Sequence, residues 1–152
     1  MSKSEDKILY IFLFIKMNCG LMSNEESICE QAMIMAGKCI MRKFKLNDKE
    51  YTVNALGELY DSDGKELSIT VCGKNKNNYR CTRLNCNKAT AYVPRVVYYV
   101  FHYNTLPPEL QHDKDVKKSL PSLRITHVDG DNSNNRIWNL KTVESNSDSS
   151  TE

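Results

Sequence analysis

The chain has 152 residues, of which 40% are hydrophobic and 26% are charged. This length gives one domain of ordinary size, or a small domain with an extension, and the composition excludes a disordered or collagen-like protein. The formal net charge of +2 neither requires nor excludes a nucleic-acid partner. The longest apolar run, Ile8–Ile15, is far shorter than the roughly 20 residues of a membrane-spanning helix, so we expect no membrane partner.

The N-terminus does not resemble an export signal, because Glu5 and Asp6 lie where a signal peptide has basic residues. We therefore expect an intracellular protein of the cytoplasm or nucleus of a host cell, not a secreted one, with its six cysteines as reduced thiols. Cys81 and Cys86 have a spacing at the wide end of the range for structural zinc. No second close pair follows them, which favours buried free cysteines over a zinc site.

Residues 1–45 are predicted to form a helical extension, to which the sequence assigns no role. Ser23 and Glu26 form a capping-box pattern, and apolar residues recur at helical spacing from Ile28 to about Met41. Such an amphipathic helix packs against a core or, less often, binds a partner through its methionines.

Residues 46–92 are predicted to form a basic, β-rich DNA-binding segment. Short apolar stretches separated by turns predict antiparallel strands between Phe44 and Thr90. Residues 42–95 carry eleven basic and six acidic side chains, and residues 73–95 carry no carboxylate at all. A basic surface of this kind suits contacts with phosphates, although a solvated hairpin without acids is an equal alternative. The candidate phosphate contacts are Lys74, Lys76, Arg80, Arg83 and Lys88.

Residues 93–103 are mostly apolar or aromatic and predict a buried helix that opens at Pro94. A short strand is expected over Leu123–His127, which gives an α+β fold of helices and small antiparallel strands. His127 ends that strand and precedes a turn rich in glycine, aspartate and asparagine. Histidine is the side chain best suited to take a proton from water near neutral pH, and nearby oxygens suit a hard divalent cation.

A calcium loop is an alternative interpretation of the same turn. Oxygen-bearing residues alternate from Asp129 to Asn135, as they do in such loops. The EF-hand loop requires glycine at its sixth position and glutamate at its twelfth, where this chain has Asn134 and Leu140. The detailed pattern therefore disfavours calcium.

The run THVDGDNSNNRIWNL, residues 126–140, resembles the HNH motif of homing and phage-type endonucleases. The resemblance extends upstream through the basic strands and the Arg95–Phe101 helix, and covers roughly Tyr51–Asp148. It implies that residues 93–152 form an endonuclease-like domain ending in a ββα-metal (His-Me finger) motif. The implied activity is metal-dependent hydrolysis of phosphodiester bonds in DNA. Viruses and mobile elements are the usual hosts of this family.

The resemblance also implies roles for individual residues. His127 takes the position of the general base that deprotonates the attacking water, and Asn139 that of the asparagine that ties the loop and so orients His127. Thr126 and Asp148 take the positions of the ligands of Mg²⁺ or Mn²⁺. Arg136 either positions a phosphate or pairs with an acid, and the sequence leaves that choice open.

Thr126 departs from the family, which has Asp or Asn at this position. A neutral threonine hydroxyl is a much poorer partner for Mg²⁺ than a carboxylate. The alternative interpretation is therefore a catalytically decayed HNH-fold protein that binds DNA or belongs to a virion or another complex.

Overall fold

The computed structural model describes residues 23–72, 79–83 and 90–143, and of residues 23–29, 72 and 79–83 it describes the backbone alone. The chain divides into two compact units, one ending at Cys39 and the other beginning at Ile40. In the first unit the described element is helix α2, Ser23–Cys39, which begins at the serine of the predicted capping box. No helix of the described residues is long and apolar enough to cross a membrane.

The predicted end of α2 near Met41 is wrong by two residues. Met41 begins strand β1 and pairs with Asn54, and the carbonyl of Ile40 accepts a hydrogen bond of 2.9 Å from the amide of Ala55. Ile40 and Met41 use their backbone groups to pair with the strand β2 region instead of continuing the helix. Tertiary pairing therefore decides where α2 ends, although the apolar residues continue at helical spacing. The division into residues 1–45, 46–92 and 93–152 stays a prediction.

The second unit contains three small antiparallel sheets among its described residues. Their strand orders are β1-β2-β3, β4-β5-β6 and β7-β8. The strands are β1 (Met41–Leu46), β2 (Lys49–Asn54), β3 (Leu59–Tyr60), β4 (Ile69–Cys72), β5 (Tyr79–Arg83), β6 (Thr90–Tyr92), β7 (Arg124–His127) and β8 (Leu140–Val143). The helices are α3 (Val93–Tyr103) and α4 (Lys114–Ser119), with the 3-10 turns η1 (Pro108–Leu110) and η2 (Ile137–Asn139). The predicted α+β class is confirmed.

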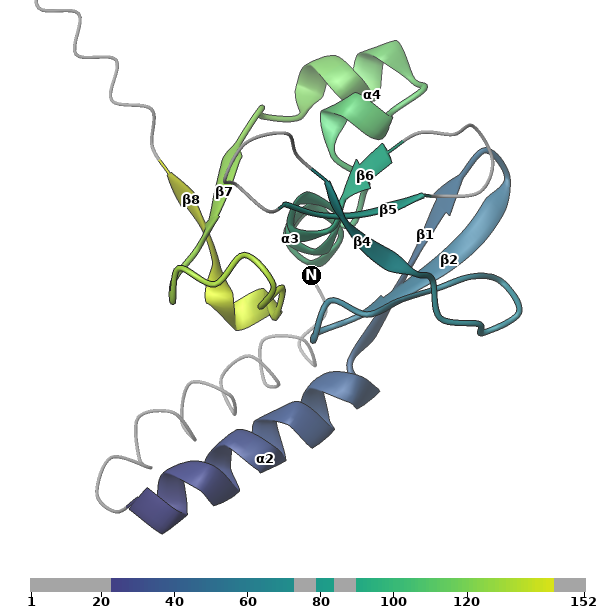
Figure 1. The fold of residues 1–152 in the computed structure, drawn as a ribbon. Coiled ribbons are helices and arrows are strands. Elements are labelled where there is room, and N and C mark those ends of the chain that lie inside the picture. The colour runs from purple at the N-terminus through teal and green to yellow at the C-terminus, as the bar shows by residue number, and fades with distance from the viewer. Residues whose placement is uncertain (1–22, 73–78, 84–89, 144–152) are drawn as a thin grey trace, which may run out of the picture. The chain divides into compact units, whose positions relative to one another are not determined.

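Helix α3 is the centre of this unit and has the predicted bounds, with Pro94 in its first turn. Figure 1 shows the helix end-on, with the small sheets arranged around it. It contacts strands of all three sheets, and Val96, Val97 and Val100 are fully buried. Each buried valine stabilises the fold by roughly 1.5–3 kcal/mol relative to an exposed one. The apolar helix therefore holds sheets together that are too small to be stable alone.

Two side chains of α3 fix the segment that leads into β7. Arg95 pairs with both carboxylate oxygens of Glu109, at 2.5 Å through Nε and 2.8 Å through Nη2, and also donates to the carbonyl of Leu123. The hydroxyl of Tyr99 donates to the carbonyl of Pro121 and accepts a bond of 3.0 Å from the amide of Leu123. Strand β7 therefore starts from an anchored backbone.

The turn between β2 and β3, residues 54–59, is held by one buried asparagine, and we name it the Asn54 turn. Asn54 is fully buried, and its Oδ1 accepts bonds from the amides of Leu56 at 3.1 Å and Glu58 at 3.0 Å. Its Nδ2 donates to the Glu58 carboxylate at 2.6 Å. Gly57 has a φ of +87°, a left-handed conformation that glycine adopts without strain. The turn is therefore closed by bonds within five residues of chain.

Candidate active site

Strands β7 and β8 form the hairpin that carries the candidate catalytic histidine. Their register runs from Arg124 opposite Val143 to His127 opposite Leu140, so residues 128–139 form the connecting loop, which we name the His127 loop. His127 is the last residue of β7 and is 8% exposed. The strand pairing therefore fixes its main chain, and the loop fixes what surrounds its ring.

Asn139 ties the His127 loop across its base. Its Oδ1 accepts a bond of 3.1 Å from the amide of Asp129, and its Nδ2 donates to Asp129 Oδ1 at 2.9 Å and to the carbonyl of Asn134 at 2.8 Å. The backbone closes the same loop, since the amide of Val128 donates to the carbonyl of Asn139 at 2.8 Å. Side-chain and backbone bonds therefore close the loop at its base, and the predicted role of Asn139 toward His127 stays a prediction.

The carboxylates of the loop are used by the loop itself. Asp129 accepts from the amide of Asp131 at 2.9 Å and from Asn134 Nδ2 at 2.6 Å, besides its bond from Asn139. These bonds, that from Asn139 first, lower the pKa of Asp129 to about 2. Asp131 in turn accepts from the amide and the hydroxyl of Ser133 at 2.8 and 2.7 Å. Both carboxylates therefore stabilise the turn through hydrogen bonds within the loop.

The ring of His127 bonds to Asn135. His127 Nε2 lies 2.9 Å from Asn135 Oδ1, and Asn135 is 5% exposed. An amide oxygen only accepts, so this bond requires the hydrogen on Nε2, and in a neutral ring with that hydrogen the lone pair is on Nδ1. Sequence reasoning did not single out Asn135, because the motif contains several asparagines and the spacing does not say which of them reaches the histidine.

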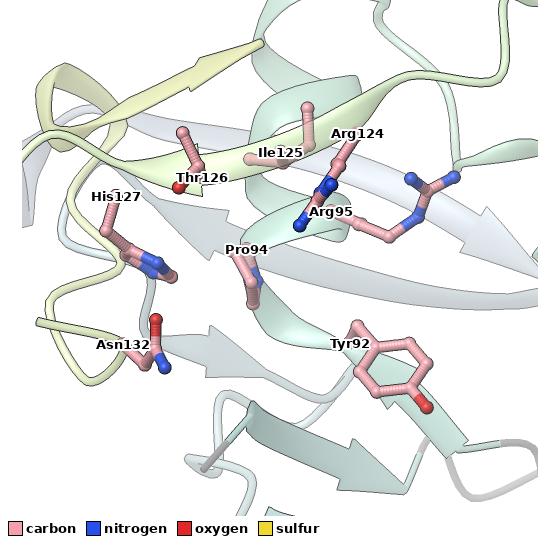
Figure 2. Close-up of a pocket in the computed structure, with 8 residues that line it drawn as sticks. All are labelled: Tyr92, Pro94, Arg95, Arg124, Ile125, Thr126, His127 and Asn132. Atoms are coloured by element: carbon pink, nitrogen blue, oxygen red, sulfur yellow. The ribbon is translucent and has the colours of Figure 1, made fainter. Parts of the chain in front are cut away.

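A pocket of about 390 Å³ opens beside His127. It is lined by the end of β6, the start of α3, strand β7 and one loop residue: Tyr92, Pro94, Arg95, Arg124, Ile125, Thr126, His127 and Asn132. In Figure 2, His127 and Asn132 lie at one end of the pocket and Tyr92 at the other, with Arg124 and Pro94 between them. The pocket therefore presents a histidine and an arginine to the same space.

The two arginines of the pocket differ in what they bond. Arg95 is half-buried and engaged with Glu109, which neutralises its charge. Arg124 is exposed, and within the described residues its side chain has no ion pair or hydrogen bond. Its guanidinium is therefore available to an anion in the pocket. Nothing in the sequence marked Arg124, because a single arginine in a strand carries no signal by itself.

The predicted metal ligands are only partly described. Thr126 is half-buried beside His127, whereas Asp148 lies outside the described residues. Within residues 23–72, 79–83 and 90–143, no group of three or more His, Cys, Asp or Glu side chains could hold a metal ion. The zinc alternative is not tested, since Cys86 is outside the described residues and only the backbone of Cys81 is described.

Comparison with protein-family models and with curated proteins finds no match. Among solved structures, this chain is similar to the HNH homing endonuclease I-HmuI, in a structure of its DNA binding and cleavage. The two chains are 26% identical, the match covers 61% of this chain and 45% of that one, and the TM-score is 0.40. This chain thus has an HNH homing endonuclease as a distant structural neighbour and matches less than half of its length.

Most predicted DNA contacts remain predictions. Outside the described residues lie Lys74, Lys76 and Lys88. Arg80 and Arg83 belong to β5, of which the backbone alone is described. Arg136 is half-buried ahead of η2, and its carbonyl accepts a bond of 2.8 Å from the amide of Asn139. The backbone of Arg136 therefore helps to shape the loop, and the role of its guanidinium stays open.

Proposed function

We propose that this chain is an HNH-type endonuclease that hydrolyses phosphodiester bonds in DNA, with His127 as the general base. The observation that carries the proposal is the His127 ring at the end of β7, bonded through Nε2 to Asn135 beside a pocket that also holds Arg124. A neutral imidazole with its lone pair on Nδ1 can accept the proton of a water that attacks phosphorus. A positioned base of this kind accelerates a reaction by about 10²- to 10⁴-fold.

Arg124 is the residue that we propose to hold the scissile phosphate. A guanidinium offers several donors in a fixed plane, which suits two oxygens of one phosphate group. The Glu109 carboxylate occupies Arg95, so of the two arginines that line the pocket Arg124 is the one free of a described partner. The basic segment with Lys74, Lys76, Arg80, Arg83 and Lys88 would extend the contact along the DNA backbone, and affinity should fall steeply as salt rises.

Mg²⁺ or Mn²⁺ is the cofactor that we propose for this reaction, with Thr126 and Asp148 as its ligands, as the resemblance implies. Within residues 23–72, 79–83 and 90–143 no three His, Cys, Asp or Glu side chains form a metal-binding group, and Asp148 lies outside these residues. This part of the proposal is tested by omitting the metal and by strengthening the site with Thr126→Asp.

A second candidate function is DNA binding without hydrolysis. The observation that favours it is Thr126, whose neutral hydroxyl stands in the pocket where a carboxylate would hold a cation better. Such a protein would keep the basic segment and Arg124 and would lack a productive metal site.

Nicking of supercoiled plasmid, with Mg²⁺ and then Mn²⁺, tests both candidates. The panel compares the wild type with His127→Ala and Thr126→Asp, and uses His112→Ala, an exposed loop histidine, as the matched control. We expect the wild type and His112→Ala to nick equally, His127→Ala to lose the activity, and chelation of the metal to stop it. Nicking by Thr126→Asp alone would favour the second function. If no protein nicks while all of them bind DNA, the proposed hydrolysis is contradicted.

A further inference from the structure

The Asn54 turn touches the His127 loop at Asn135. A Cβ atom added to Gly57 would lie 2.7 Å from both the Cβ and the carbonyl oxygen of Asn135, which is closer than real Cβ atoms approach other atoms. Two residues after Asn135, the amide of Ile137 donates a hydrogen bond of 2.9 Å to the carbonyl of Ala55, which belongs to the same Asn54 turn. The backbone of one turn is therefore seated against the residue that bonds to the histidine.

We propose that Asn135 is the residue that positions the His127 ring, and that the Asn54 turn holds Asn135 in place. This inference rests on the proposed function, because it concerns the same histidine. The bonds of the Asn139 side chain go to Asp129 and to the carbonyl of Asn134, so Asn139 closes the loop. The hydrogen bond of the His127 ring within the described residues goes to Asn135.

The chemical consequence concerns the tautomer and the orientation of the ring. The amide oxygen of Asn135 keeps the hydrogen on Nε2, which leaves Nδ1 as the nitrogen that accepts a proton. Asn135 is buried, and the backbone of Gly57 lies so close to its Cβ and carbonyl oxygen that a Cβ atom at residue 57 would clash with both, so the main chain of Asn135 is held in place. A ring held in one orientation is what a general base needs, since misplacement by about 1 Å can cost about 100-fold in rate.

Two pairs of variants separate the positioning role from general stability. Asn135→Asp keeps an acceptor oxygen near Nε2, whereas Asn135→Leu has a similar size and no acceptor. Gly57→Ala pushes into Asn135, and Gly64→Ala is its matched control. Both glycines have a left-handed φ, +87° and +76°, so both substitutions strain the backbone, but a Cβ at Gly64 meets no atom within 4 Å.

The first readout is nitrogen and proton NMR of the imidazoles in the full chain, without metal or DNA. The chain has three histidines, so His102 and His112 serve as internal references. We expect a solvent-protected Nε2 proton on His127 in the wild type, in Gly64→Ala and in Asn135→Asp. It should be lost in Asn135→Leu and weakened in Gly57→Ala. A resonance that survives in Asn135→Leu, or that is absent from the wild type, overturns the positioning role.

The second readout is the rate of plasmid nicking, measured with the DNA affinity of the same variants. We expect Asn135→Leu and Gly57→Ala to lose about tenfold or more in nicking rate at unchanged affinity, with Asn135→Asp recovering part of the rate. The two readouts fail separately. NMR signals that follow the expected pattern without any nicking support the positioning and contradict the hydrolysis, whereas nicking with an unchanged resonance in Asn135→Leu contradicts the positioning alone.

Discussion

Two turns of this molecule are built in the same way and differ in what they carry. Asn54 and Asn139 are both buried, and each accepts backbone amide bonds and donates to a carboxylate in its own turn. The Asn54 turn contains no histidine, whereas the His127 loop follows one directly. The same feature, a buried asparagine that holds a turn closed, therefore occurs in a turn without a candidate catalytic residue and in the loop of the candidate active site.

The two turns also differ in how far along the chain their ties reach. The bonds of Asn54 stay within four residues, whereas those of Asn139 reach back five and ten residues. A local turn closes by itself, but the longer loop depends on the pairing of β7 with β8 to bring its ends together. The candidate site therefore depends on contacts that are more distant along the chain than those of the turn beside it.

The largest expected effect is on the rate of DNA nicking and distinguishes the His127 loop from the Asn54 turn. His127→Ala should lower the nicking rate by about 10²- to 10⁴-fold, because it removes the proton acceptor and leaves the loop ties in place. The DNA affinity should change little, and the two rates are compared at a temperature where both proteins are fully folded. The comparison between the two turns would break down if Asn54→Ala lowered the rate as much at a temperature where that variant is fully folded.

Asn54→Ala should instead act on stability. It leaves the amides of Leu56 and Glu58 without their acceptor, and we expect the free energy of unfolding to fall by about 1–3 kcal/mol. Urea unfolding followed by circular dichroism measures this difference, with exposed Ser62→Ala in the neighbouring turn as the control. A loss no larger than that of the control would show that the buried asparagine does not hold the turn.

A smaller effect is expected on DNA affinity when the two arginines of the pocket are substituted. Arg124→Ala should weaken binding to duplex DNA severalfold and lower the slope of log affinity against log salt by about one, as expected for one lost phosphate contact. Arg95→Ala should leave that slope unchanged and reduce thermal stability, because Arg95 bonds to Glu109 and Leu123. Equal salt slopes in the two variants would contradict a phosphate contact by Arg124.

The smallest effect concerns acid stability. The folded pKa of Asp129, about 2, lies below its ordinary value of 3.8, so ionised Asp129 stabilises the fold above about pH 4. This contribution is lost as the pH falls from about 4 to about 2. Asp129→Asn should therefore flatten the acid side of the stability profile relative to the wild type, measured as the melting temperature at each pH. Parallel profiles would show that the carboxylate does not stabilise the loop.

The sequence predicted most of the framework and part of the site. Helix α3 has the predicted bounds, because a mostly apolar or aromatic segment with a proline in its first turn satisfies both burial and helix initiation locally. The short strands between Phe44 and Thr90 followed from the turns that separate them. The end of α2 was misjudged, because Met41 pairs with Asn54, and helical spacing contains no information about a partner strand.

The sequence by itself determined the α+β class, the central helix and a histidine at the end of a strand before an asparagine-rich turn, because each depends on residues close together in the chain. The tertiary structure alone decided that Asn135 meets His127, that Gly57 lies against Asn135, and that Arg95 is bound to Glu109 while Arg124 has no such partner among the described residues. His127 and Asn135 are eight residues apart in one loop, whereas Gly57 and Asn135 come from separate elements, as do Arg95 and Glu109. Hydrogen bonds and close approaches depend on distances that spacing along a chain does not encode.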